Sequence, residues 1–210
     1  MALYPVNLKV GGRLCVIVGG GRVALRKTES LLECEAEVKV IAPVLDDGFT
    51  GLHGRFEYVA RPYRWGDLGG AFLAIAATDD DTTNRAVEEE ARGRHMLLNM
   101  VDKPGQCNFY VPSVIRRGEL MISVSTGGEL PALSRRLRRQ LQEQFPEQWG
   151  RALELWGKAR RRVLSQIHNK EEKQKCLTEL AALDLAAALK AGGDTAAQAE
   201  IDKCISRYLA

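Results

Sequence analysis

The 210-residue sequence lacks the patterns that mark membrane and secreted proteins. No apolar run approaches the roughly 20 residues that a membrane-spanning helix needs, and the start of the chain has no basic segment followed by an apolar one. The five cysteines, at positions 15, 34, 107, 176 and 204, are scattered and form no C-x-x-C pair. We therefore expect a cytoplasmic protein with no signal peptide, membrane anchor, disulfide framework or zinc site.

Histidine is scarce, and the motifs of several large enzyme classes are missing. The three histidines, at positions 53, 95 and 168, lie in unrelated contexts, so we expect surface or supporting roles for them rather than metal ligation. No H-E-x-x-H, G-x-S-x-G or P-loop pattern occurs. The sequence predicts no metal ligands.

Neither basic nor acidic residues are in large excess, but the net charge is unevenly distributed along the chain. The formal net charge is +3, of which residues 113–175 carry +7 while residues 1–112 and 176–210 carry −2 each. A basic zone of this kind could attract a polyanion, or it could simply reflect helices with solvated arginine-rich faces. Charge alone favours the second explanation. The zone also lacks interleaved aromatic residues and any known nucleic-acid-recognition motif, which argues against nucleic-acid binding.

The most informative stretch runs from Arg13 to Lys27. Leu14–Val18 is a short apolar run typical of a buried parallel strand, and it is followed by three glycines and a helical pattern. Gly19, Gly21 and Ala24 fit the form G-x-G-x-x-A, in which a tight turn brings backbone close to a pyrophosphate. A helix that begins here would present free N–H groups to phosphates. The alternative is a glycine-rich turn with no ligand.

A second β-branched run, Val38–Ala42, completes a β-α-β unit and stops at Pro43. In a dinucleotide-binding fold, an acidic residue at the end of this strand often binds the adenosine ribose. Here Asp46 and Asp47 come several residues late, and no arginine is ready for a 2′-phosphate. The usual clue therefore leaves NAD and NADP undecided. Nucleotide contacts are expected at Gly19, Gly20, Gly21, Arg22, Val23, Ala42, Pro43, Val44, Thr78 and Asp79.

The rest of the chain predicts an α/β fold followed by a different kind of structure. Further strands are expected near 56–60, 72–77 and 96–101, with a helix near 83–92 whose start the aspartates after Thr78 would cap. A strand, turn and strand follow at 114–125, then a helix from Pro131 and helices near 149–168, 171–189 and 195–209, with a turn at Gly192-Gly193. A hairpin and one amphipathic helix are too little to fold alone. They must pack on the first domain or on a second copy of the chain.

Asp102 lies at the expected end of the last parallel strand, where such sheets bind ligands. Aspartate before x-Pro is also a common turn residue, and spacing alone does not decide between the two roles.

Several ordered motifs resemble one enzyme family. They are Tyr4-Pro5, residues 18–27, 74–80, 99–104, Pro112-Ser113 and Val124–Gly128 with Pro131-Ala132. Together, over residues 1 to about 145, they are similar to the precorrin-2 dehydrogenase / sirohydrochlorin ferrochelatase family, the front portion of siroheme synthase. The resemblance implies a Rossmann-type NAD-binding domain at 1–112, a dimerisation region at 113–146 and a helical domain at 147–210.

The family's chemistry implies that NAD⁺ accepts a hydride from precorrin-2 to give sirohydrochlorin, and that Asp102 is catalytic. Bifunctional members also insert Fe²⁺, and the sequence does not say whether this chain does. The substrate's eight carboxylates give the basic zone a purpose, since arginines pair with carboxylates. Expected substrate contacts are Asn99, Arg116, Arg117, Ser125, Thr126, Gly127, Arg135 and Arg138. The resemblance also implies a homodimer, and Thr126 stands where some members carry a phosphorylated serine. Two alternatives remain: a nucleotide-sensing module without catalysis, and a chelatase alone.

Overall fold

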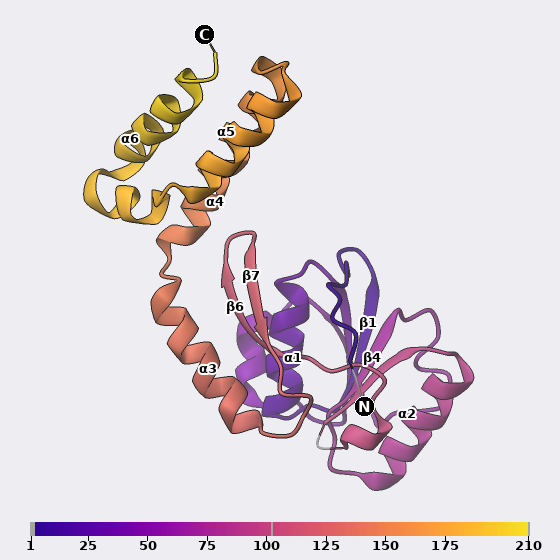
Figure 1. Ribbon diagram of the computed structural model, residues 1–210. Coiled ribbons are helices and arrows are strands. Elements are labelled where there is room, and N and C mark those ends of the chain that lie inside the picture. The colour runs from indigo at the N-terminus through magenta and orange to yellow at the C-terminus, as the bar shows by residue number, and fades with distance from the viewer. Residues whose placement is uncertain (1–2, 102, 210) are drawn as a thin grey trace. The chain divides into compact units, whose positions relative to one another are not determined.

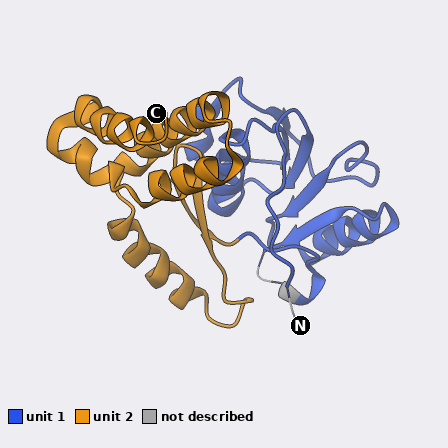
Figure 2. Ribbon diagram, turned by 45° about the horizontal axis from the view of Figure 1, so that its top comes forward, with its two compact units in different colours: residues 1–111 blue, residues 112–210 orange. Residues whose placement is uncertain are grey.

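The computed structural model describes residues 3–101 and 103–209. The chain divides into two compact units, Met1–Val111 and Pro112–Ala210 (Figure 2). Among the described residues, none of the helices combines the length and the apolar character that crossing a bilayer requires.

The first unit is a five-stranded parallel sheet with strand order β3-β2-β1-β4-β5, covered by helices (Figure 1). This confirms the predicted α/β, Rossmann-type fold. Its elements are β1 (Leu14–Val18), α1 (Arg22–Leu32), β2 (Glu37–Ile41), the 3₁₀ helix η1 (Asp47–Leu52), β3 (Glu57–Val59), β4 (Leu73–Ala76), α2 (Asp81–Gly93), β5 (Leu97–Met100) and the 3₁₀ helix η2 (Pro104–Gln106).

Burial on both faces explains why the central strands are continuous apolar runs. One core cluster includes Ile17 of β1 and Ala24 of α1, while a second includes Val16 of β1 and Val87 of α2. The side chains of β1 alternate between these two cores, and the register places Val18 beside Ile41 and Ala76. The carboxyl ends of β1, β2 and β4 therefore lie together at one edge of the sheet.

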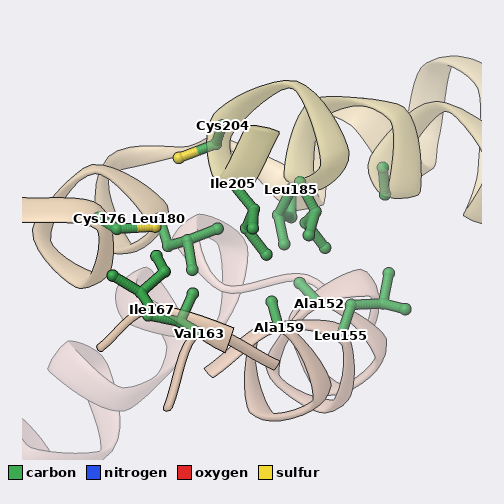
Figure 3. Close-up of a cluster of buried hydrophobic side chains, with 12 residues drawn as sticks. Ala152, Leu155, Ala159, Val163, Ile167, Cys176, Leu180, Leu185, Cys204 and Ile205 are labelled. Atoms are coloured by element: carbon green, nitrogen blue, oxygen red, sulfur yellow. The ribbon is translucent and has the colours of Figure 1, made fainter. Parts of the chain in front are cut away.

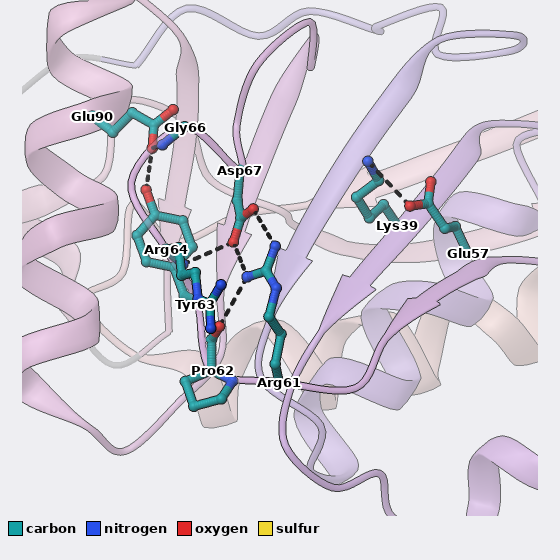
Figure 4. Close-up of polar contacts among 9 residues, drawn as sticks. All are labelled: Lys39, Glu57, Arg61, Pro62, Tyr63, Arg64, Gly66, Asp67 and Glu90. Atoms are coloured by element: carbon teal, nitrogen blue, oxygen red, sulfur yellow. Dashed lines mark hydrogen bonds and ion pairs between the residues drawn. The ribbon is translucent and has the colours of Figure 1, made fainter.

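The connection from β3 to β4 has no helix, and side chains hold it in place (Figure 4). Glu90 of α2 is 1% exposed and accepts hydrogen bonds from the Tyr63 hydroxyl, the Gly66 N–H and the Arg94 side chain. Burial and the Glu90 carboxylate raise the pKa of Tyr63. This buried carboxylate anchors a loop that sequence periodicity could not place.

Over residues 112–209, the second unit combines a hairpin with four helices. Strands β6 (Ser113–Arg117) and β7 (Leu120–Val124) are antiparallel, and Gly118, with φ +56°, makes the turn between them. The helices are α3 (Pro131–Gln144), α4 (Gln148–Gln166), α5 (Lys170–Ala182) and α6 (Leu185–Ser206). The hairpin packs on α3 and α4 within this unit. The division of residues 113–210 at position 146 stays a prediction.

Helices α4, α5 and α6 share one apolar core (Figure 3). It contains Val163, Leu180 and Ile205, together with two free cysteines, Cys176 and Cys204, that are 0% and 1% exposed. Burial raises the pKa of the Cys176 thiol to about 11, and the neighbouring Cys204 adds to the effect. The Cys176 thiol therefore serves as a packing group at neutral pH.

The expected helix over 171–189 is wrong. Helix α5 ends at Ala182, and α6 begins at Leu185 because the Asp184 carboxylate caps it by accepting a hydrogen bond from Ala187 N. The break predicted at Gly192-Gly193 is present as a kink, where Gly193 has φ 65° and ψ −159°.

Candidate nucleotide-binding site

The three consecutive glycines have different surroundings. A Cβ added to Gly19, whose φ is +123°, would lie 2.1 Å from Ala77 O, and one added to Gly20 would lie 2.0 Å from Val44 O. A Cβ added to Gly21 meets nothing within 4 Å. The first two glycines are therefore required by protein packing, whereas the third borders open space that a ligand can enter.

Helix α1 begins at this open glycine. Gly21 is its N-cap, in an extended conformation with no side-chain hydrogen bond to the cap. The first helical hydrogen bond runs from Leu25 N to Gly21 O at 3.0 Å. The N–H groups of residues 22–24 thus precede the helical hydrogen-bond series, at the positive end of the helix dipole. This is the arrangement that a pyrophosphate needs.

The segment after β2 lies against the glycine turn. Gly19 N donates to Ile41 O at 2.9 Å, and Gly20 touches the backbone of Val44. Ala42 is buried, while Val44 is 76% exposed. The structure therefore brings Ala42, Pro43 and Val44 next to the glycines, with Val44 presented to solvent.

The segment after β4 reaches the same edge. Asp80 caps α2 by accepting a hydrogen bond from Thr83 N at 2.9 Å, as the sequence predicts for one of the aspartates. Thr78 is held by its hydroxyl, which accepts from Asp80 N at 3.1 Å, and by its carbonyl, which accepts from the Asn84 amide at 2.9 Å. Asp79 is exposed. Asn84, which sequence reasoning missed, is 4% exposed and fixes this loop from α2.

Asp102 lies outside the described residues, but hydrogen bonds and an ion pair hold the residues on either side of it. Val101 N donates to Ala76 O at 2.9 Å, and the Lys103 ammonium pairs with Asp81 of α2. Further along, the Cys107 sulfur accepts from Met100 N at 3.1 Å and donates to Met100 O at 3.2 Å. Cys107 was also missed, since a lone cysteine carries no signal of such a role.

Asn99 is used inside the first unit. It is 8% exposed, and its amide donates to Phe109 O at 3.1 Å. The structure thus gives Asn99 the role of holding the segment after η2 on β5.

The second unit places the expected substrate residues in two different settings. Arg117 is 9% exposed, and its guanidinium donates to Phe145 O at 2.8 Å and pairs with Glu147 at 3.0 Å. Arg117 therefore lies buried at the junction between the hairpin and the helices and does not extend into solvent. Arg116 and Arg135 are exposed, and Arg138, which is partly exposed, donates to Gln142 at 2.6 Å.

The loop after β7 is folded onto the start of α3. The Thr126 and Ser134 hydroxyls are 3.0 Å apart, and Ser125 accepts from Gly127 N at 3.2 Å. Gly127 adopts φ +64°, so a glycine suits the position. Ser134 is 7% exposed and was not expected from the sequence to take part.

Residues 6–113 match a sequence family described as "Putative NAD(P)-binding". The chain belongs to this NAD(P)-binding family. The matched residues contain the glycine turn, the whole parallel sheet and the segment around Asp102. They cover nearly all of the first unit, Met1–Val111, and the first two residues of the second.

Relatives of known name cover nearly the whole chain. It is 35% identical over 205 residues to siroheme synthase 1 of Pectobacterium atrosepticum, covering 97% of this chain and 43% of that protein. It is 35% identical over 208 residues to siroheme synthase of Chromobacterium violaceum, covering 98% and 44%. The chain thus spans less than half the length of these relatives. The resemblance to this family that the motifs suggested is confirmed.

A solved structure shares the fold. The chain superimposes on SirC, a precorrin-2 dehydrogenase, with a TM-score of 0.78 and 24% identity, over 98% of this chain and 100% of that one. This likeness shows that the NAD(P)-binding domain and the helical unit occur together in a known architecture.

The residues present fit a dinucleotide. The open Gly21 and the free N–H groups that follow it can receive the pyrophosphate, and exposed Val44 offers an apolar surface beside them. In the described part of the chain, no three His, Cys, Asp or Glu side chains lie together so that they could hold a metal ion.

Proposed function

We propose that this protein is an NAD-dependent dehydrogenase that converts precorrin-2 to sirohydrochlorin. The observation that carries the proposal is the open glycine turn at the start of α1. It is supported by siroheme synthase relatives at 35% identity over nearly the whole chain.

In this proposal the nucleotide occupies the carboxyl edge of the sheet. The N–H groups at the start of α1 bind the pyrophosphate, and Pro43 and Val44 border the adenosine. Thr78 and Asp79, after β4, face the same edge. NAD⁺ supplies the acceptor for the hydride. The chain's own side chains orient the two reactants.

Oxidation of precorrin-2 releases one hydride and one proton. We assign the proton to the carboxylate of Asp102, because it follows the strand next to β4 at the edge where the nucleotide lies. A carboxylate held beside the reacting carbon acts as a general base. The ties at Val101, Lys103 and Cys107 fix the ends of the segment that carries it.

The substrate's carboxylates call for cations and N–H donors. We propose Arg116, Arg135 and Arg138, with the Ser125–Gly127 loop at the start of α3, as the tetrapyrrole-binding residues. Arginine pairs with carboxylates through two hydrogen bonds. Arg117 is left out because its guanidinium is buried and engaged within the unit.

A homodimer is proposed for the same unit. An open groove of about 570 Å³ lies between β7 and α3, lined by Val124, Leu137 and Leu141 and by the polar residues Gln140, Glu143 and Gln144. Its apolar surface greatly exceeds its polar surface, so an element of a second copy would bury it favourably. Light scattering coupled to size exclusion should give twice the monomer mass of 23.2 kDa.

The enzymatic proposal is tested by mixing purified protein with precorrin-2 and NAD⁺ and following NADH absorbance. NADH should accumulate, and Asp102→Ala should lose turnover while it still binds the nucleotide. No NADH from folded protein would reject the proposal. Adding Fe²⁺ to sirohydrochlorin with and without protein tests the family's second reaction, and equal rates reject it.

A further inference from the structure

Asp46 lies beside the glycine turn although it follows the end of β2 by five positions. Its backbone N–H donates to Gly20 O at 2.7 Å. The residues in between pass directly over the turn, since a Cβ on Gly20 would meet Val44 O at 2.0 Å and the Ala42 side chain at 2.9 Å. The chain therefore returns to the place where a ribose-binding acidic residue is found in dinucleotide folds.

The carboxylate of Asp46 is held in place, but it can still accept further hydrogen bonds. Its Oδ1 accepts a hydrogen bond from Gly48 N at 3.0 Å, which caps η1. Its Oδ2 lies 3.7 Å from Arg22 Nε, and the side chain is 31% exposed. An ionised carboxylate can accept about four hydrogen bonds, so acceptor capacity remains for the hydroxyl groups of a ribose.

Arg22 is held far less firmly than Asp46. It is the first residue of α1, its side chain is 93% exposed, and its ion pair with Asp46 is long. Exposed pairs of this kind are weak, so the guanidinium is able to turn toward a ligand. The fixed carboxylate of Asp46 and the movable guanidinium of Arg22 thus lie next to each other beside the glycine turn.

We propose that Asp46 accepts the 2′-hydroxyl of the adenosine ribose and makes the site select NAD over NADP. A 2′-phosphate would meet the Asp46 carboxylate at contact distance, and like charges repel strongly there. Arg22 is the group that receives a 2′-phosphate once the charge at position 46 is removed. This inference rests on the proposed NAD-dependent function and concerns the ribose end of its cofactor.

The test is isothermal titration of the full chain with NAD⁺ and with NADP⁺. Wild-type protein should bind NAD⁺ at least about tenfold more tightly than NADP⁺. With NADP⁺, the hydrogen bond from the ribose 2′-hydroxyl to the Asp46 carboxylate is replaced by repulsion between the 2′-phosphate and that carboxylate. In Asp46→Asn, which keeps the cap on η1, that preference should fall by about tenfold or more. Adding Arg22→Gln to that variant should weaken NADP⁺ binding again.

Asp47→Asn is the matched control, since it removes an adjacent exposed carboxylate with no hydrogen bond to the turn, and it should leave the preference within about twofold of wild type. Asp46→Ser provides a second capping residue if Asp46→Asn misfolds. A preference unchanged in the Asp46 variants, with NAD⁺ still bound, overturns the inference and leaves the dehydrogenase standing. Wild-type protein that binds neither nucleotide overturns both.

Discussion

Alanine placed at each glycine of the turn should separate packing from ligand binding. At Gly21 the backbone has φ −82° and ψ −175°, which any residue adopts, and the added methyl meets no protein atom within 4 Å. Gly21→Ala should therefore raise the free energy of unfolding by about 0.4–1 kcal/mol, through lower entropy of the unfolded chain. Its affinity for NAD⁺ should fall about tenfold or more, equivalent to at least about 1.4 kcal/mol, because the methyl enters the proposed pyrophosphate space.

The two preceding glycines should behave in the opposite way. Gly19→Ala forces a side chain onto φ +123° and within 2.1 Å of Ala77 O, at a cost of about 1–3 kcal/mol for backbone strain and about 1–3 kcal/mol for overpacking. Gly20→Ala carries only the overpacking cost, at Val44 O. Against a domain stability of about 5–15 kcal/mol, Gly19→Ala removes a large share.

Urea unfolding and isothermal titration, run on the same preparations, check both halves of this expectation. Gly12→Ala is the control for strain alone, because Gly12 has φ +65° but open space around its Cβ, and it should cost about 1–2 kcal/mol. If Gly21→Ala binds NAD⁺ as tightly as wild type, the open space is not the pyrophosphate site. If Gly19→Ala is as stable as wild type, the packing argument fails.

Two further predictions concern buried charges. Burial alone would raise the pKa of Glu90, but hydrogen bonds from Tyr63, Gly66 and Arg94 hold this pKa below its ordinary value. The ionised carboxylate therefore stabilises the fold at pH values above the unfolded-state pKa of about 4.3. This contribution to stability is lost as the pH falls through the lower folded-state pKa. Glu90→Gln should cost about 2–3 kcal/mol at pH 7, and urea unfolding should show the gap to wild type closing in acid; a constant gap would contradict the reasoning. Arg117→Ala should destabilise the second unit by about 2–4 kcal/mol, whereas exposed arginines such as Arg135 should change its thermal unfolding by less than about 0.5 kcal/mol when replaced by alanine. Equal effects would mean that the buried contacts contribute nothing.

The central strands of the first unit could be predicted because parallel strands buried on both faces leave unbroken apolar runs. The glycine turn was equally visible, since its spacing reflects local geometry. The start of α2 followed from the aspartates, and Asp80 is its cap. The missed boundary between α5 and α6 also had a local signal. Asp184 is a good N-cap residue, but the alanine-rich sequence around it favoured one continuous helix.

What could not be predicted depends on contacts between distant residues. Glu90 holds a loop through Tyr63, which lies 27 residues earlier in the chain, and no periodicity connects the two. Arg117 looked like a solvent-facing arginine in a basic zone, yet its bond to Phe145 spans 28 residues. Asp46 follows β2 by five residues, and counting along the chain places it away from the strand. The backbone instead turns back to Gly20.

The fixed positions around Asp102 bear on how the proposed base would act. Proton transfer depends on holding the base within hydrogen-bond reach of the reacting atom, so motion of the segment that carries it reduces the rate. Three contacts of different chemistry hold the described residues on either side of it: a backbone hydrogen bond at Val101, an ion pair at Lys103 and the thiol of Cys107. Two of them reach other elements, β4 and α2, which also frame the nucleotide site. The elements that would orient the cofactor are therefore also the ones that hold the residues on either side of Asp102.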